Sequence, residues 1–337
     1  MACLAFRPAG TLALTMLTVR SVLALLLVAL PAAGAAQPVA KISRIGYLTH
    51  ISAAADAAQL EAFREGLRAL GYIEGQNILI ESRYADGQLE RLPALAAELL
   101  RLKVDVIVAA PTPAIRAVQK ATQTVPIVMA FSGDPVADGF VAGLARPGGN
   151  ITGHSAAVAE MAGKRVEFLK AIVPKLSHAA HLINPEITQR AVTETEVAAR
   201  SLGVRVTTIS VRNARDVDRA FSTMHRPRVD GLIVALTVKH HWPQIVDLAV
   251  KNHLPTVSGP RDFVDAGGLI AYGPHYPDLF RRSAVYVDRI LKGARPGSLP
   301  VEQPTRFEFG INRKAAHALG LTIPPSLLLQ ADHVVEQ

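Results

Sequence analysis

The chain has 337 residues, of which 50% are hydrophobic and 19% are charged, and its formal net charge is +8. This balance is typical of a globular protein and excludes a disordered chain. Lys and Arg residues are scattered rather than clustered with aromatic residues, which argues against a nucleic-acid partner. At this length two lobes are expected rather than one core.

Residues 1–36 have the pattern of a secretory leader. Arg7 and Arg20 supply positive charge, and the apolar run "SVLALLLVAL" is followed by the small residues of "PAAGAAQ". The pattern predicts a signal peptide cleaved near Ala36 and a periplasmic protein. An uncleaved anchor helix is the alternative, because "TLALTMLTV" lengthens the apolar segment.

Cys3 is the only cysteine, and it lies inside this leader. The mature chain is therefore predicted to have no disulfide, no thiolate nucleophile and no cysteine metal site. His240 and His241 come nearest to a metal cluster, but adjacent helical residues point about 100° apart. No metal and no cofactor is predicted.

From residue 43, strand-like and helix-like patterns alternate. Leu60, Phe63 and Leu67, for example, share one face of a helix. The first series predicts strands at 44–48, 77–84, 104–110 and 125–131, and helices at 57–71, 89–102 and 112–122. The second predicts strands at 178–184, 204–210, 229–235 and 254–258, and helices at 186–202, 214–224 and 241–252.

Two such series predict an α/β fold of two Rossmann-like lobes, each with a parallel sheet flanked by helices. The remaining patterns predict a strand at 267–273, a long helix at 276–293 and a strand-helix pair at 305–320, and they are interpreted as the chain crossing back between lobes. Crossings are expected near 151–156, 272–276 and 298–305. Lobe 1 is predicted to comprise 42–153 plus 274–300, and lobe 2 to comprise 154–273 plus 303–336.

Ligands of parallel α/β sheets bind beyond the carboxyl ends of the strands, so residues just after each strand are candidates. From lobe 1 these are Thr49, His50, Ser52, Asp86, Thr112 and Asp134. From lobe 2 they are Asn184, Thr237 and Ser258. Tyr272 and Tyr276 flank the second crossing and are expected to stack on a ligand, with core packing as the alternative for Tyr272.

The segment after the strand at 125–131 reads Ser132-Gly133-Asp134-Pro135. It predicts a helix that begins near Val136 with unpaired amide groups, beside a carboxylate that faces the ligand. The alternative for Asp134 is a helix N-cap. Gly148 and Gly149 indicate a turn at the first crossing.

Motifs of common enzymes are missing from the sequence: G-x-S-x-G, H-E-x-x-H, the P-loop and G-x-G-x-x-G do not occur. No catalytic residue is predicted. Catalysis by paired acids stays open as an alternative, through any convergence of Asp56, Asp86, Asp134 and Asp265.

Several stretches resemble a known family. They include "FREGLRALGYIEGQNILIESRYADGQLERLPALAAELL", "VPIVMAFSGDPVADGFV", "LARPGGNITG" and "INRKAAHALGLTIPPSLL". These look like ABC-transporter substrate-binding proteins of the tryptophan/tyrosine-binding type, over essentially all of residues 42–336. The resemblance implies a type I periplasmic binding protein fold with three crossovers, and delivery of a small solute to a membrane permease.

The resemblance also implies individual site residues. The family's loop after the third strand matches Thr112 and Pro113, and its Asp-Pro matches Asp134 and Pro135. Its Asn-x-Thr-Gly matches Asn150 and Thr152, which become ligand-binding candidates. The acidic residue that follows this motif in the aromatic amino-acid binders is missing here, where the chain reads His154-Ser155-Ala156-Ala157.

The predicted function is the solute-binding component of an ABC uptake system, which closes on one small molecule by hinge motion. The expected partners are a small solute and an inner-membrane permease, and the chain is predicted to act as a monomer. A sensory protein that docks to a membrane receptor and a periplasmic hydrolase are the alternatives. Co-transcription with permease and ATPase genes favours transport, and turnover of a substrate favours hydrolysis.

Overall fold

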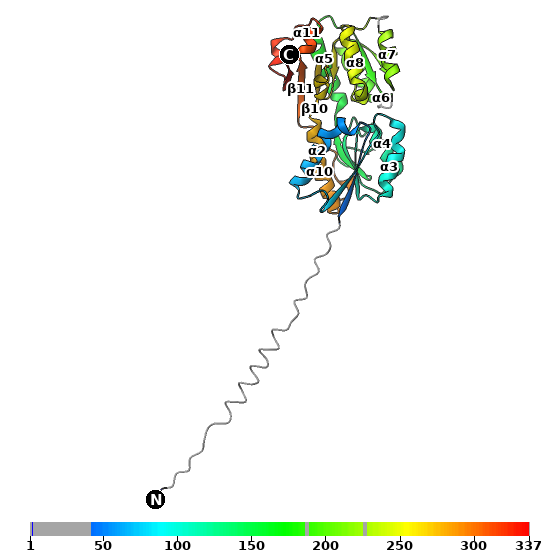
Figure 1. Cartoon of the computed structure of the whole chain (residues 1–337), viewed down its shortest axis with the longest axis vertical. Helices are drawn as coiled ribbons and strands as arrows, with labels where there is room; N and C mark the ends of the chain where they lie inside the picture. Colours follow the sequence, from blue (N-terminus) through cyan, green and yellow to red (C-terminus); the bar gives the residue numbers. More distant parts are fainter. Residues whose placement is uncertain (1, 3–41, 186–188, 225–227, 337) are drawn as a thin grey trace. The chain divides into compact units, whose positions relative to one another are not determined.

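Two β-sheets organise the folded part of the chain (Figure 1). The computed structural model describes residue 2 and residues 42–185, 189–224 and 228–336, so the predicted leader lies outside the described residues except for residue 2. Within the described residues, no helix is both long and apolar enough to cross a membrane.

The first sheet has five parallel strands in the order β2-β1-β3-β4-β5. Its strands are β1 (Ser43–Thr49), β2 (Ile78–Tyr84), β3 (Val106–Ala110), β4 (Ile127–Ser132) and β5 (Ile151–Ser155). The helical elements of this part of the chain are α2 (Ala53–Ala69), η1 (Leu89–Arg91), α3 (Leu92–Arg101) and α4 (Thr112–Ala121). Together with α10 (Tyr276–Leu291), which packs against α2, they form the first lobe.

The second sheet has seven strands in the order β12-β11-β10-β9-β8-β6-β7. They are β6 (His178–Ile183), β7 (Arg205–Ser210), β8 (Gly231–Val234), β9 (Thr256–Ser258), β10 (Ile270–Pro274), β11 (Phe307–Asn312) and β12 (His333–Val335). Its longer helices are α5 (Val158–Ile172), α6 (Gln189–Ser201), α7 (Ala214–Thr223) and α8 (Trp242–Lys251). Short elements complete the chain: η2 (Leu236–His241), α9 (Asp262–Asp265), η3 (Pro296–Ser298), α11 (Arg313–Ala318) and α12 (Pro325–Leu328).

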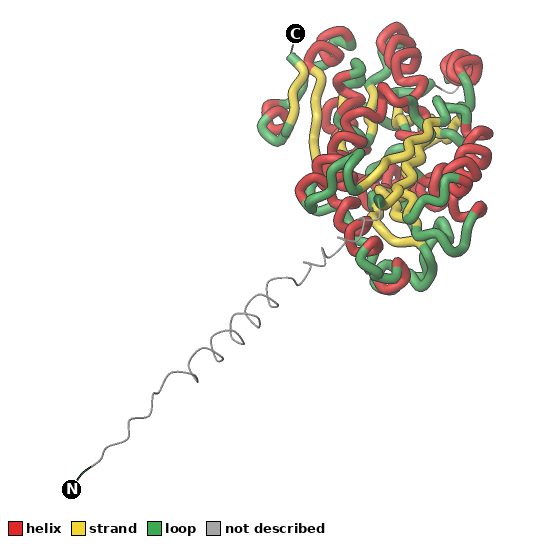
Figure 2. Tube along the Cα trace, turned by 60° about the horizontal axis from the view of Figure 1, so that its bottom comes forward, coloured by secondary structure: helices red, strands yellow, loops and turns green. Residues whose placement is uncertain are grey.

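The predicted α/β fold of two lobes is confirmed, and helices flank the strands of both sheets (Figure 2). One pair, β10 with β11, is antiparallel, so the second sheet is not wholly parallel. The segments at 270–274 and 307–312 form strands, as the sequence predicts, and both extend this sheet. The residue bounds proposed for the two lobes stay a prediction.

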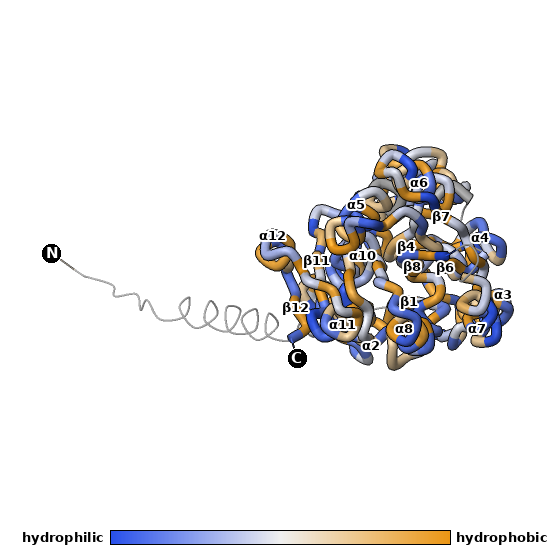
Figure 3. The backbone as a smooth tube through the Cα atoms, turned by 90° about the horizontal axis from the view of Figure 1, so that it is seen from above, coloured by the Kyte–Doolittle hydropathy of each residue, from blue (hydrophilic) through white to orange (hydrophobic). Residues whose placement is uncertain are grey.

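The hydrophobic core of each lobe is built around apolar strands whose two faces are both covered by other elements. All residues of β3 and β4 are buried, and their near-continuous apolar sequence is typical of parallel strands. Figure 3 colours the chain by hydropathy, with hydrophobic residues in orange. Phe63 and Leu67 of α2 are almost fully buried in the same core, and each stabilises the fold by about 1.5–3 kcal/mol.

Close contact between α2 and α10 explains why α10 belongs to the first lobe. A Cβ atom at Gly66 would lie 2.2 Å from the carbonyl oxygen of Arg281. Only glycine allows the two backbones to approach so closely. The chain thus passes back from β10 to the first lobe at His275 and Tyr276, where the sequence placed the second crossing.

The helix predicted to begin near Val136 does not form, and residues 134–139 make a tight turn instead. The amide of Asp138 donates to the carbonyl of Asp134, and the amide of Phe140 donates to that of Pro135. Gly139 then adopts φ +70°, a left-handed conformation that stops the chain after a single helix-like turn. The prediction was wrong because this glycine comes too early for a helix.

Candidate functional site

A cavity of about 90 Å³, here called the main cavity, lies between the two sheets at the carboxyl ends of their central strands. Its first-lobe wall comes from the ends of β3 and β4: Pro111, Thr112, Phe131 and Gly133. Its second-lobe wall comes from α5, α6, β6, β8 and the loops that follow β8 and β9: Ala162, Arg165, His181, Thr195, residues 233–237 and Gly259. Tyr276, at the start of α10, completes the lining.

A smaller cavity of about 30 Å³, the side cavity, adjoins the first. The two share part of their walls: Pro111, Phe131, Leu236 and Tyr276. The lining of the side cavity includes five polar or charged residues: Thr49, His50, Asp56, Gln59 and Lys239. The two cavities therefore form neighbouring compartments between the lobes.

Arg165 brings a buried positive charge to the main cavity. It is 8% exposed and lies on α5 within an apolar stripe that includes Ala162 and Leu169. Its Nε donates to the carbonyl of Tyr272 at 2.8 Å. Among the described residues no carboxylate forms an ion pair with it, and burial lowers its pKa. A guanidinium held in this way has donors left for a ligand.

His181 lies in the middle of β6 and is 5% exposed. Burial, with a smaller contribution from the charge of Arg165, lowers its pKa to about 4, so the ring is neutral at neutral pH. Its Nδ1 is buried without a hydrogen-bond partner. Unpartnered buried polar atoms are rare in folded proteins and point to a ligand or a water.

Tyr276 joins the aromatic wall to the polar groups. Its ring meets the ring of Phe131 edge to face, with centroids 4.7 Å apart. Burial raises the pKa of its hydroxyl to about 12, which keeps the hydroxyl protonated and able to donate.

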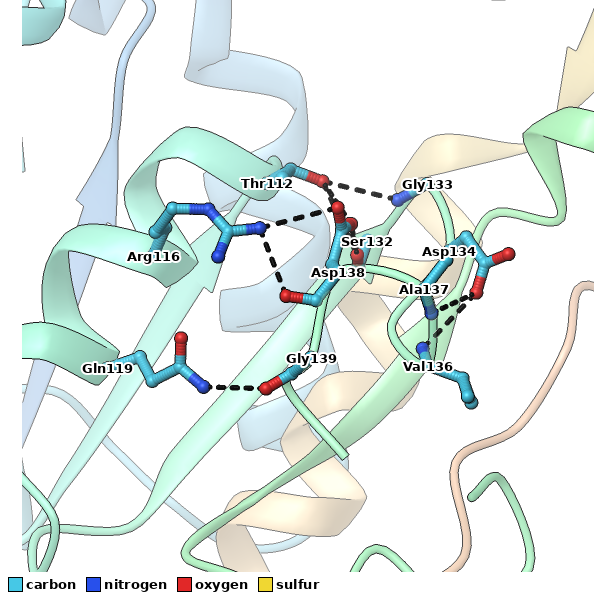
Figure 4. A network of polar contacts seen from close by, with 10 residues as sticks. All are labelled: Thr112, Arg116, Gln119, Ser132, Gly133, Asp134, Val136, Ala137, Asp138 and Gly139. Carbon is cyan, nitrogen blue, oxygen red and sulfur yellow. Dashed lines mark hydrogen bonds and ion pairs between the residues drawn. The ribbon is translucent and has the colours of Figure 1, made fainter. Parts of the chain in front are cut away.

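A polar network fixes the first-lobe wall (Figure 4). The hydroxyls of Thr112 and Ser132 both donate to Oδ2 of the buried Asp138, at 3.1 and 3.0 Å. Arg116 reaches Oδ1 of the same carboxylate at 3.4 Å. Burial raises the pKa of Asp138, and the two hydroxyl hydrogen bonds oppose that rise. The network joins the start of α4 to the end of β4.

Two contacts link the lobes beside the side cavity. The ammonium group of Lys239 donates to the carbonyl of Ala55 at 3.4 Å and pairs with Asp262. His240 also packs across the boundary between the lobes, against Gly87. A Cβ atom at Gly87 would lie 1.5 Å from Cδ2 of His240. Residues of η2 thus contact loops of the first lobe.

The structure brings together five of the residues proposed from sequence. Thr112, Thr237 and Tyr276 line the main cavity, and Thr49, His50 and Tyr276 line the side cavity. Burial lowers the pKa of His50 to about 4, and the nearby His240 adds to this effect. These five positions lie at or near strand ends that border the cavities, and their role in binding a ligand stays a prediction.

Other proposed residues of the first lobe lie outside both cavity walls. Ser52 caps α2 by accepting from the amide of Ala55. Asp86 pairs with Arg91 at 3.0 Å. Pro113 is buried in the first turn of α4. Oδ1 of Asp134 accepts from the amides of Val136 and Ala137, at 3.2 and 3.0 Å. The geometry gives Asp134 a capping role in its turn.

The same holds for three proposed residues of the second lobe. Ser258 is fully buried and donates to the carbonyl of Val234 at 2.7 Å. Tyr272 packs against Phe168 in the core below the second sheet. The amide of Asn184 donates to the hydroxyl of Thr237 at 3.1 Å, which holds a cavity-lining side chain in place.

The side chains of the motif Asn-x-Thr-Gly at β5 bond to neighbouring backbone groups. Asn150 donates to the carbonyl of Val125 at 2.8 Å, and Thr152 donates to the carbonyl of Leu299 at 2.6 Å. Gly153 has φ +128°, and a Cβ atom there would lie 2.1 Å from the carbonyl oxygen of Met129. The motif tethers β5 to its neighbours, and it does not line either cavity.

The four acids considered for paired catalysis have separate partners. Asp56 accepts from the hydroxyl of Tyr47 at 2.6 Å, and Asp265 pairs with His333 at 2.7 Å. Asp86 and Asp134 make the contacts given above. Within the described residues no group of three His, Cys, Asp or Glu side chains is arranged to hold a metal ion.

Sequence reasoning missed Arg165 and His181. It considered only residues that follow strands, whereas Arg165 lies inside a helix and His181 inside a strand. A signal was present for Arg165, because it interrupts the apolar spacing of Ala162, Val166 and Leu169. A charge in such a stripe needs a partner or a function.

Comparisons with known proteins agree with this architecture. The profile of a family described as "ABC transporter substrate binding protein" matches residues 44–335. A curated relative from Clostridioides difficile (strain R20291), described as a tyrosine-binding protein, is 26% identical over 265 residues, which cover 77% of this chain and 76% of that protein.

Solved structures give the same match. A Streptococcus pneumonia ABC domain in complex with L-Trp is 27% identical with a TM-score of 0.81, over 88% of this chain and 100% of that chain. A ligand-free, open substrate-binding protein from Clostridium difficile is 25% identical with a TM-score of 0.64, over the same shares. The chain is thus more similar in shape to the complex, in keeping with the contacts of Lys239 and His240 across the lobes.

Proposed function

Because the chain belongs to the family of ABC transporter substrate-binding proteins, we propose that it captures one small solute in the main cavity and delivers it to an ABC permease of the inner membrane. The observation that carries the proposal is the position of the main cavity, whose walls come from the strand ends of both lobes. A solute there contacts both lobes at once. It therefore stabilises the arrangement in which the lobes meet.

The contacts of η2 support closure by hinge motion. Lys239 and His240 touch the first lobe at Ala55 and Gly87 through polar or small contacts, and Leu236 of η2 packs against the cores of both lobes. The polar and small contacts separate at small cost when the lobes open. The crossings near His275 supply the hinge in this proposal.

We further propose that the leader at residues 1–36 directs export to the periplasm and that the chain acts there as a monomer. The extracytoplasmic setting is that of the family. The solute-lining residues proposed here are Thr112, Arg165, His181, Thr237 and Tyr276.

The test is to purify the full chain from its native host and identify what is bound by mass spectrometry. We expect one small solute per chain, released on unfolding, and a higher melting temperature when it is restored to the stripped protein. A protein that never carries a solute contradicts the proposal. A solute that is chemically converted during incubation indicates the hydrolase alternative instead.

A further inference from the structure

We propose that Arg165, His181 and Tyr276 form a carboxylate subsite, and that the solute is a small monocarboxylate with an apolar body. This inference rests on the proposed function and names the class of solute. It starts from the second-lobe side of the main cavity, where the guanidinium of Arg165 lies near the unpartnered Nδ1 of His181 and no described residue of the lining is Asp or Glu.

The first step is the charge balance of the cavity. Arg165 is the only charged side chain that the described residues contribute to its lining, which includes no Asp or Glu. A buried guanidinium without a counter-ion is costly unless a ligand supplies the negative charge. The planar guanidinium fits a carboxylate with two parallel hydrogen bonds.

The second step is the convergence of donors at Gly259. A Cβ atom at this glycine would lie 2.8 Å from Nη2 of Arg165 and 3.7 Å from the hydroxyl oxygen of Tyr276. The two donors therefore adjoin the same point of the wall, which is kept free of a side chain. His181 is close enough to Arg165 for the guanidinium to lower the pKa of its ring, and its Nδ1 is unpartnered.

The third step is the nature of the remaining wall. The rest of the lining is mainly apolar and includes Phe131, Ile233, Leu236, Ala162 and Pro111. They suit an aromatic ring or a branched alkyl chain. A cavity of about 90 Å³ is several times the roughly 10–15 Å³ that one water needs, so it has room for a small organic solute. Benzoate and 4-methylpentanoate are suitable probes because each joins a carboxylate to a compact apolar body.

The experiment measures binding of matched probes to the full mature chain by calorimetry and by melting temperature. The carboxylates are benzoate and 4-methylpentanoate, and the neutral controls are benzamide and 4-methylpentanamide. L-Leucine adds an ammonium group to the second carbon skeleton. We expect each carboxylate to bind more tightly than its amide, by about 10- to 100-fold, and L-leucine to bind no more tightly than 4-methylpentanoate.

Variants assign the effect to the subsite. Arg165→Met is expected to weaken binding of both carboxylates by about 10- to 100-fold and to leave the weak binding of the amides unchanged. Tyr276→Phe keeps the ring and removes one donor, so a smaller loss is expected, confined to the carboxylates. Arg219→Met is the matched control, since Arg219 is highly exposed on α7, and its affinities should equal those of the unmodified chain.

Three results overturn the subsite: amides that bind as well as carboxylates, a Tyr276→Phe variant that binds both classes unchanged, or L-leucine binding more tightly than 4-methylpentanoate. Mass spectrometry of the co-purified solute separates this failure from that of the proposed function. A neutral or cationic solute rejects the carboxylate and leaves solute capture intact. Absence of any solute contradicts solute capture itself.

Discussion

On the first-lobe side of the main cavity, Thr112 and Ser132 donate to Asp138, which also pairs with Arg116. On the second-lobe side, Arg165 has one hydrogen bond and Nδ1 of His181 has none. Both sets are buried and polar. Polar groups that satisfy one another stabilise a wall, whereas groups left without partners are available to a ligand.

This difference shows that position at a strand end is not enough to identify a binding residue. Asp134 follows β4, yet its Oδ1 accepts two amides of its own turn. Arg165 follows no strand, yet it lines the main cavity. The number of internal partners is the better guide.

The largest expected effect concerns the network of the first-lobe wall. Replacing Asp138 with Ala removes the acceptor of two buried hydroxyls and the Oδ1 contact of Arg116, which keeps its bond to the backbone carbonyl of residue 138. At about 1–3 kcal/mol for each hydroxyl left without its acceptor, we expect the free energy of unfolding to fall by about 2–5 kcal/mol, measured by urea denaturation. Asp138→Asn keeps one acceptor and should lose less. If the Ala variant loses under about 1 kcal/mol, the network is not what stabilises this wall.

A second prediction concerns Asp56 in the side cavity, whose pKa is raised to about 7 by burial, against the opposing hydrogen bond from Tyr47. The folded chain keeps this proton up to about pH 7, whereas the unfolded chain loses it near pH 4. Folding therefore takes up a proton in this window, and the contribution of Asp56 to stability falls as pH rises from about 4 to about 7.

Asp56→Asn removes that titration and keeps an acceptor for Tyr47. The variant should gain stability relative to the unmodified chain by about 1.4 kcal/mol per pH unit across the window. Urea denaturation at a series of pH values measures the difference. Parallel pH profiles for the two proteins would show that Asp56 is ionised in the fold at neutral pH.

A smaller effect is expected at the turn after β4. Asp134→Ala removes the acceptor for the amides of Val136 and Ala137, and should lower the free energy of unfolding by about 1 kcal/mol. Affinity for the co-purified solute should be unchanged. Asp134→Asn retains the cap and serves as the control. A large loss of solute affinity with an unchanged melting temperature would show that Asp134 binds the solute rather than capping its turn.

The smallest effect on stability is expected at the second-lobe wall. His181→Leu replaces a buried ring whose Nδ1 has no partner with an apolar side chain. The free energy of unfolding should change by less than about 1 kcal/mol, in contrast to Asp138→Ala, although both residues are buried. Solute affinity should fall. A loss of stability comparable to that of Asp138→Ala would remove the distinction between the two walls.

Much of the fold could be predicted because apolar strands and amphipathic helices alternate. Among the elements that were missed, β5 and α5 have clear physical explanations. The strand β5 reads "ITGHS" and has no apolar run that would reveal it. Hydrogen bonds such as that from Thr152 to the carbonyl of Leu299 help to hold it in place instead. The helix α5 begins at an N-cap, Ala157, that offers no capping side chain, so its start carries no sequence signal.

The candidate site could be predicted only in part. Thr112 and Thr237 follow strands, and a loop rule identifies them. Arg165 and His181 reach the main cavity from within α5 and β6, so their roles depend on which face of each element meets the other lobe. Sequence periodicity marks a face as apolar, but it does not show that a cavity lies against it.

The central claim is that the lobes close over a solute, and small-angle X-ray scattering tests it most directly. The chain stripped of its co-purified solute should show a larger radius of gyration than the chain with the solute restored. Gly87→Ala, which places a methyl group against His240, should oppose this contraction. Gly71→Ala, at a similar φ with no neighbour within 4 Å, should not. An unchanged radius of gyration on solute binding would contradict the account.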